Sequence, residues 1–261
     1  MRLKDKVAVV TGAAQGIGRA TALAMGREGV RVVVADLQAE KAQAVANELQ
    51  ALGAEALAVE VNVANETSVK RMARSTFERF QRADILVNVA GIYYPKASVV
   101  DLSEEDWDRT IDINVGSNFL CCREFVPAMR AQKSGRIISL ASGIGHYGMR
   151  QFSHYAASKA AVMGFVKALA REVGPDGITV NAICPGSANT SMPHVAIMRA
   201  YVTIEVAKLI SPKPAAPKWR ITANDTANPI ALAHTSAPAS TRYRKGRESR
   251  RTRIIAPPST P

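Results

Sequence analysis

The amino-acid sequence predicts an α/β fold, a doubly wound parallel sheet in three layers with helices on both faces. Two observations lead to this prediction. Short apolar segments rich in β-branched residues alternate with longer segments of helical spacing, which is typical of βαβ units. A glycine-rich turn at residues 11–18 joins the first apolar segment to the first helical one. Right-handed crossovers would bring the carboxyl ends of all strands to one edge of the sheet, where such folds bind ligands.

The predicted strands are short and apolar along their whole length, as expected of strands buried on both faces of a sheet. They cover residues 7–10, 32–35, 56–61, 85–89, 137–140 and 178–183. The intervening helices combine good helix formers with an amphipathic pattern. The clearest of them cover residues 39–52, 66–80, 104–129 and 153–173.

A single folded domain is expected over residues 1–209, because a chain of 261 residues is long enough for one sizeable core. The alternation of strands and helices stops near residue 210. Residues 210–261 contain at least seven prolines and a basic cluster at 242–253, without a segment that predicts a strand or a helix. We interpret them as a basic, proline-rich, atypical tail that is poorly ordered or out of frame.

The formal net charge of +12 raises the possibility of a nucleic-acid partner. Residues 208–261 carry eleven basic residues against two acidic ones, so this segment accounts for +9 of that charge. The rest of the chain is nearly neutral. Nucleic-acid binding is therefore the less favoured hypothesis, and it predicts a strongly salt-dependent affinity that truncation at residue 210 would remove.

Cysteine usage and hydropathy favour a cytoplasmic protein. The three cysteines have no metal-ligand spacing, and the adjacent pair Cys121 and Cys122 cannot easily form a disulfide. The first six residues are mostly charged and unlike a signal peptide, and no apolar run approaches the length of a membrane span. We expect a reduced, cytosolic setting with neither a metal site nor a membrane partner.

The glycine-rich turn predicts a binding site for a dinucleotide. Gly12, Gly16 and Gly18 lie between the first predicted strand and a helix that starts near Arg19. Glycines let the backbone turn sharply and approach a pyrophosphate, and the N–H groups of the helix N-terminus favour its negative charge. A lone glycine pattern carries little weight, but here it has the strand and helix context that the motif requires.

Asp36 favours NAD over NADP. It ends the second predicted strand, twenty-four residues beyond Gly12. A carboxylate at this place can accept hydrogen bonds from both adenosine ribose hydroxyls and would repel a 2′-phosphate. Gln15 offers no positive charge in the turn to offset that repulsion, although Arg19 is near. The alternative is an acid that only caps the following helix.

Tyr155 and Lys159 predict a proton-transferring pair. Their spacing of four places the phenol and the ammonium on one face of a helix. The pKa of a free tyrosine is near ~10, and a nearby cation can stabilise the phenolate. Ser142 follows the fifth predicted strand thirteen residues before Tyr155 and can hold a substrate carbonyl. Ser139 competes for that role, but strand alternation favours Ser142.

Taken together, these motifs resemble the short-chain dehydrogenase/reductase family, whose fold is Rossmann-like. The matching residues span positions 3 to about 205 in the family's order, and they are the turn at 11–18, Asp36, the segment Asn88-Val89-Ala90-Gly91, Asn114, Ser142, Tyr155, Lys159, Pro185, Gly186 and Thr190. As a set they are highly specific.

The resemblance implies a role for each matching residue. Tyr155 is then the acid/base, Ser142 holds the substrate oxygen, Lys159 lowers the pKa of the tyrosine and binds the nicotinamide ribose, and Asn114 anchors a water. The implied cofactor-binding set is Gly12, Gln15, Gly16, Ile17, Gly18, Asp36, Leu37, Asn62, Val63, Asn88, Ala90, Gly91, Tyr155, Lys159, Pro185, Gly186 and Thr190. A homodimer or homotetramer is also implied.

The sequence departs from the family's pattern at three places. Asn62 stands where the family usually has Asp, and Val89 where it has a second Asn. The family's last helix, last strand and glycine-rich end have no counterpart in residues 211–261. We hypothesise that this tail is an out-of-frame continuation. If neither alternative reading frame encodes a helix and a strand ending in a glycine pair, the tail is a native extension.

The leading functional hypothesis is reversible oxidation of a secondary alcohol to a ketone with NAD. An NADPH-dependent 3-oxoacyl-type reductase is the near alternative, and a nucleotide-binding protein without turnover is a different class. Substrate specificity is expected in loops at 92–96, 144–151 and 187–201. Tyr93 and Tyr94 either pack on an aromatic substrate or cover the loop, and His146, Tyr147 and His154 are more often loop surface than catalysts.

Overall fold

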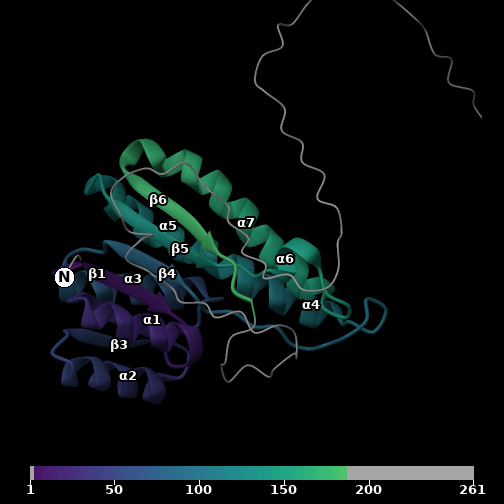
Figure 1. Ribbon diagram of the computed structural model, residues 1–261, viewed down its shortest axis with the longest axis horizontal. Helices are drawn as coiled ribbons and strands as arrows, with labels where there is room; N and C mark the ends of the chain where they lie inside the picture. Colours follow the sequence, from purple (N-terminus) through teal and green to yellow (C-terminus); the bar gives the residue numbers. More distant parts are fainter. Residues whose placement is uncertain (1–2, 187–261) are drawn as a thin grey trace, which may run out of the picture. The chain divides into compact units, whose positions relative to one another are not determined.

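The computed structural model describes residues 3–186, and within them the predicted fold is confirmed. Six parallel strands form one sheet in the order β3-β2-β1-β4-β5-β6. Figure 1 shows the sheet with helices on both sides. The strands are β1 (Val7–Thr11), β2 (Arg31–Asp36), β3 (Ala56–Glu60), β4 (Ile85–Asn88), β5 (Gly135–Leu140) and β6 (Ile178–Ile183). The order reverses between β1 and β4, which is the position where such sheets bind ligands.

The helices predicted from the hydrophobic pattern are present, most with boundaries within a residue or two, and one further short helix, α6 (Ile144–Tyr147), lies in the segment 144–151 that was expected to be a loop. They are α1 (Gly16–Arg27), α2 (Ala39–Ala51), α3 (Glu66–Phe80), α4 (Glu104–Ile111), α5 (Ser117–Ala131), α6 (Ile144–Tyr147) and α7 (Ser153–Val173), with a π-helical turn η1 (Asp112–Gly116) and a 3₁₀ turn η2 (Gly174–Asp176). Side chains of Asn65 and Ser103 cap the N-termini of α3 and α4 by accepting from the N–H groups of Ser68 and Asp106.

Two apolar layers bury the sheet from both sides. Val7 and Val9 of β1 face the layer formed with α3, α5 and α7, whereas Ala8 and Val10 face the layer formed with α1 and α2. All four residues are fully buried. Successive side chains of a strand point to opposite faces, so burial on both faces explains why β1 is apolar without alternation.

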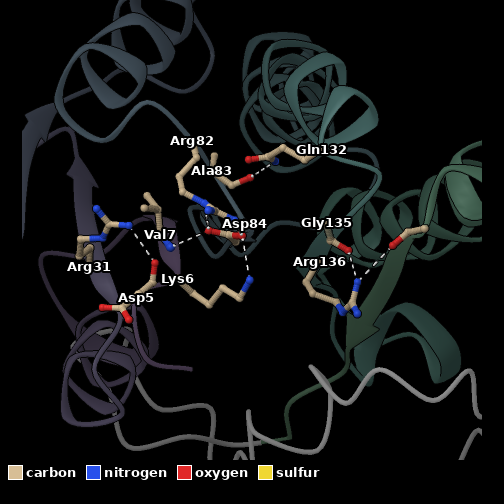
Figure 2. Close-up of polar contacts among 11 residues, drawn as sticks. Asp5, Lys6, Val7, Arg31, Arg82, Ala83, Asp84, Gln132, Gly135 and Arg136 are labelled. Carbon is tan, nitrogen blue, oxygen red and sulfur yellow. Dashed lines mark hydrogen bonds and ion pairs between the residues drawn. The ribbon is translucent and has the colours of Figure 1, made fainter. Parts of the chain in front are cut away.

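Asp84 connects β1 to β4 at the amino-terminal edge of the sheet (Figure 2). Its carboxylate accepts from Val7 N at 3.0 Å and Arg82 Nη2 at 2.6 Å, and lies 3.3 Å from Lys6 Nζ. Burial would raise the pKa of Asp84, but the hydrogen bonds from Arg82 and Val7 and the charge of Lys6 outweigh it and lower that pKa. This cluster holds β1 and β4 together at the edge of the sheet opposite to the carboxyl ends of the strands.

Cys121 and Cys122 are buried core residues, and all three cysteines are free. Burial raises the pKa of the Cys122 thiol to about 12. Within residues 3–186 no helix has both the length and the hydropathy that a membrane-spanning helix needs. Thr190 and the predicted tail at 210–261 lie outside the described residues.

Candidate active site

The glycine-rich turn brings β1 close to the segment that follows β4. Gly12 has φ = +65°, and a Cβ at this position would lie 2.9 Å from the backbone of Ala90. A Cβ at Gly18 would overlap the carbonyl oxygen of Gly12. Both positions therefore require glycine, because any side chain would push the turn or the neighbouring segment away. The turn leaves space for a backbone or a phosphate group to approach, and α1 begins at Gly16 within it.

Thr11 is a positioning residue that the sequence reasoning did not single out. Its Oγ1 accepts from Val89 N at 3.1 Å and from Ala90 N at 3.3 Å. These bonds tie the last residue of β1 to the loop after β4. A threonine directly before the glycine turn is the signal that could have predicted this connection.

Asp36 lies buried at the carboxyl end of β2, beside the glycine turn. Its Oδ2 accepts from Ala14 N at 2.9 Å, and its Oδ1 accepts from Gln38 N at 3.0 Å. The carboxylate is thus fixed between the turn and the start of α2.

The other predicted cofactor residues differ in what their side chains can reach. Asn88 is buried, and its Nδ2 points to Ser139 Oγ at 3.4 Å and Cys122 Sγ at 3.8 Å, so its amide nitrogen is directed into the core. Asn62 is exposed and its Oδ1 accepts from Ala64 N. The remaining residues differ in exposure: Gln15 and Leu37 are exposed, Ile17 is half-buried and Val63 is buried.

A π-helical turn places Asn114 at the site, where the sequence predicts a continuous helix over 104–129. The side chain of Asn114 accepts from Ile92 N and donates to Ile92 O, both at 2.8 Å. Its Nδ2 also donates to Ser158 Oγ at 2.9 Å, and Asn118 Nδ2 donates to Asn114 O at 2.8 Å. These bonds compensate for the locally widened backbone, and such π turns are frequent at functional sites.

Tyr155, Ser142 and Lys159 converge at the carboxyl ends of β5 and β6. The side chain of Ser142, whose Oγ accepts from Ile144 N at 3.2 Å, is near enough to the phenol of Tyr155 to lower its pKa. Lys159 Nζ lies 5.7 Å from the centre of the Tyr155 ring and donates to Leu140 O at 2.8 Å. Gly91 lies between this amine and Asn114, since a Cβ there would be 3.4 Å from Lys159 Nζ and 2.9 Å from Asn114 Oδ1.

Burial shifts the pKa of both titratable groups toward their neutral forms. It raises the pKa of Tyr155 above its ordinary value and outweighs the effect of Ser142, which lowers it. It also lowers the pKa of Lys159 from 10.5 to about 8. The expected lowering of the Tyr155 pKa by Lys159 is therefore not seen in the described chain, because desolvation dominates and the amine is directed to Leu140 O.

The loop after β6 completes the described part of the site. Pro185 is buried and accepts from Gly143 N at 3.3 Å through its carbonyl oxygen, so it lies beside Ser142. Gly186 is exposed. The residues brought together are those of a hydride- and proton-transfer site: a glycine cradle with a fixed carboxylate for a dinucleotide, and a phenol paired with a hydroxyl for a carbonyl.

Comparisons with known proteins agree with this arrangement. Residues 6–197 match the model of the short chain dehydrogenase family. The 3-oxoacyl-[acyl-carrier-protein] reductase of Synechocystis sp. is 42% identical over 191 residues, which are 73% of this chain and 77% of the relative. A (2S)-[(R)-hydroxy(phenyl)methyl]succinyl-CoA dehydrogenase subunit of Thauera aromatica is 40% identical over 192 residues, covering 74% of this chain and 77% of that subunit.

Solved structures with the same fold support the same assignment. Levodione reductase is 33% identical with a TM-score of 0.71, and the match covers 73% of this chain and 74% of that one. A metagenomic short-chain oxidoreductase in complex with NADP is 34% identical with a TM-score of 0.69, covering 72% and 85%. With this fold, this site and these relatives, the chain belongs to the short-chain dehydrogenase family and is an oxidoreductase that acts on CH–OH groups.

Proposed function

We propose that the protein interconverts a secondary alcohol and a ketone with NAD, and that Tyr155 is its catalytic acid/base. The observation that carries this proposal is the convergence of Tyr155, Lys159 and Ser142 at the same sheet edge as the glycine turn and the buried Asp36. A substrate oxygen bound between the two hydroxyl groups would be in reach of both.

The residues then divide the reaction between them. In the oxidation direction Tyr155 acts as the phenolate, after its own proton has passed to solvent. The alcohol O–H proton passes to this phenolate, and the carbinol C–H bond breaks with its electron pair to leave a C=O bond. When bound, the nicotinamide cofactor accepts that hydride and returns it in the reverse direction. Ser142 holds the substrate oxygen, and Lys159, whose amine donates to Leu140 O in the cofactor-free chain, would bind the nicotinamide ribose.

The residues around the glycine turn fit a dinucleotide. Gly12 and Gly18 form a cradle that any Cβ would fill, which suits a pyrophosphate. Asp36 would accept hydrogen bonds from the ribose hydroxyls, and this supports NAD over NADP. The other predicted cofactor residues, namely Gln15, Gly16, Ile17, Leu37, Asn62, Val63, Asn88, Ala90, Gly91, Pro185, Gly186 and Thr190, belong to the same proposal.

Relatives named 3-oxoacyl-[acyl-carrier-protein] reductase, and a structural neighbour in complex with NADP, support a second candidate. It is the reduction of a 3-oxoacyl substrate with NADPH. The two candidates share Tyr155, Ser142 and Lys159 and differ in the cofactor and in the group attached to the carbonyl.

A panel of alcohols and ketones that includes a 3-oxoacyl thioester, each tested with NAD(H) and NADP(H), tests both candidates. Cofactor absorbance reports turnover. Our proposal predicts turnover of simple secondary alcohols or ketones with a higher kcat/KM for NAD(H). Turnover restricted to the 3-oxoacyl thioester and NADPH would contradict it. We further propose a cytoplasmic homodimer or homotetramer, as the family resemblance implies; light scattering measures the assembly.

A further inference from the structure

Two loops bring aromatic rings to the proton-transfer site. In the loop after β4, Tyr93 stacks on Phe152 with ring centres 5.1 Å apart and planes inclined by 6°. The Tyr93 ring also meets Tyr155 edge-on, with centres 5.8 Å apart and planes inclined by 79°. Tyr93 and Phe152 are buried, and Tyr93 packs against one side of the Tyr155 ring. These two rings are therefore part of the packing of the loop after β4.

Tyr94 continues this aromatic cluster toward solvent. Its ring centre lies 4.7 Å from that of Tyr93, yet its side chain is 47% exposed. Val99 and Val100, further along the same loop, are also exposed. These exposed side chains add little to the core, in which the stacked rings of Tyr93 and Phe152 already close this part of the loop.

Tyr147 supplies a second exposed ring from the loop after β5. It ends the short helix α6, is 69% exposed, and lies over the backbone of Gly143, where a Cβ would come within 3.0 Å of its Cε1 atom. Gly143 directly follows Ser142 and has no side chain to displace the Tyr147 ring, so this exposed ring lies on the loop that carries the hydroxyl proposed to hold the substrate. The phenol of Tyr147 is also close enough to Tyr155 to raise the pKa of that residue.

We infer that the substrate carries an aromatic or other planar conjugated ring next to the reacting carbon, and that Tyr94 and Tyr147 are the specificity-determining residues that contact it. This inference rests on the proposed function. Two exposed rings stand on different loops near the proton-transfer group: Tyr94 packs on Tyr93, which contacts Tyr155, and Tyr147 lies over Gly143, next to Ser142 in the chain. An aromatic substituent on the carbinol carbon would cover the apolar surface that they leave in water. An acyl chain would cover it without the ring-to-ring contact.

Acetophenone and cyclohexyl methyl ketone form a matched pair of probes, because they share the carbonyl and the methyl group and differ in ring planarity. The inference predicts a kcat/KM for acetophenone about tenfold or more above that for the cyclohexyl ketone. A ring contact contributes about a two- to tenfold preference. Tyr147→Leu and Tyr94→Leu should therefore each reduce the ratio by a factor in that range, whereas Tyr147→Phe and Tyr94→Phe should retain it.

Phe119→Leu is the matched control, since Phe119 is 49% exposed on α5 and has no part in the proposed site. The ratio in this variant should equal that of the wild type. A wild-type ratio near one, or leucine variants that keep the wild-type ratio, would overturn the inference.

Saturation-transfer NMR of the two ketones on the full chain separates failure of this inference from failure of the proposed function. If neither ketone nor any member of the alcohol panel is turned over, the proposed function fails. Saturation of the acetophenone ring protons that is lost in Tyr147→Leu would still support the aromatic contact. Equal saturation of both ketones in wild type and variant would reject it.

Discussion

Asp36 combines a structural role with the proposed choice of cofactor. Both carboxylate oxygens accept backbone N–H groups, from Ala14 and from Gln38, and the side chain is buried. The sequence placed this acid at a strand end and left open whether it caps a helix or contacts a ribose. The structure connects it to the start of α2 and also to the glycine turn, so the capping role does not exclude the cofactor role.

Asp36→Asn should shift the cofactor preference toward NADP. The substitution removes the negative charge that opposes a 2′-phosphate, so the ratio of kcat/KM for NADP to that for NAD should rise about tenfold or more, corresponding to about 1.4 kcal/mol. The amide keeps one acceptor, so the free energy of unfolding should fall by about 1 kcal/mol. Glu60→Gln removes an exposed carboxylate from the end of the neighbouring strand and is the control. An unchanged ratio in Asp36→Asn would speak against the NAD preference.

Lys159 makes the stability of the cofactor-free protein depend on pH. Burial lowers its pKa from 10.5 to about 8, so between these values the unfolded chain holds a proton that the folded chain has released. The free energy of unfolding should therefore rise as pH increases from about 8 to 10.5. At about 1.4 kcal/mol per pKa unit, the rise is of the order of 3 kcal/mol relative to Lys159→Met. Urea unfolding across this range measures it, and parallel curves for the two proteins would show that the assigned shift is wrong.

The glycine turn acts at the scale of whole elements, because it sets the distance between β1, α1 and the loop after β4. Gly18→Ala should abolish dinucleotide binding and destabilise the fold by about 1–3 kcal/mol, since its Cβ would overlap Gly12 O. Gly164→Ala in α7 is the matched control: nothing lies within 4 Å of its Cβ position. That variant should stabilise the helix by about 0.5–1 kcal/mol. Calorimetry measures the change in stability, and titration with NAD measures the change in binding. If Gly18→Ala binds NAD with the affinity of the wild type, the glycine turn is not the pyrophosphate-binding site.

Asp84 joins two neighbouring strands at the edge opposite the site. Asp84→Asn leaves Arg82 and Lys6 beside a neutral side chain, but both cations are 42% exposed and stay solvated, so the free energy of unfolding should fall by about 1–2 kcal/mol. Because the folded pKa of Asp84 is lowered, its contribution is present above the unfolded pKa and is lost as pH falls through the folded value. The difference between wild type and variant should therefore shrink in acid, while NAD affinity near pH 7 stays equal. A difference that persists in acid would contradict this assignment.

The elements also show where sequence periodicity stops being informative. It located the helices α2, α3 and α7, because their apolar positions repeat with the period of a helix, whereas the strands were located as short, continuous apolar runs. It could not locate the π turn at Asp112–Gly116, in which the buried residue is the polar Asn114. That turn depends on contacts between Asn114 and Ile92, which come from distant parts of the sequence.

For the whole molecule, the sequence predicted the fold class and the family, because Asp36 ends a strand, the glycine turn follows one, and Tyr155 and Lys159 lie one turn apart on α7. It did not predict Thr11 or Ser158 as connecting residues, since a hydroxyl group carries no signal of its partner. Ser158 accepts from Asn114 and donates to Tyr155 O at 2.8 Å. The sequence also did not predict that burial raises the pKa of Tyr155, because this effect depends on packing rather than on the spacing of residues.

Residues 210–261 are the last feature to consider for the whole molecule. We propose that they are not part of the family domain, in line with a family match that covers residues 6–197. The other two reading frames of the coding DNA beyond codon 210 test the out-of-frame origin.

The central claim is that Tyr155 transfers the proton while a dinucleotide is bound beside it. Its most direct test compares NAD(H)-dependent turnover and NAD binding in wild type and in Tyr155→Phe, which removes one hydroxyl group and keeps the ring. The account predicts a loss of kcat of about 10²–10⁴-fold with NAD affinity nearly unchanged. Turnover within a few-fold of the wild type would contradict it.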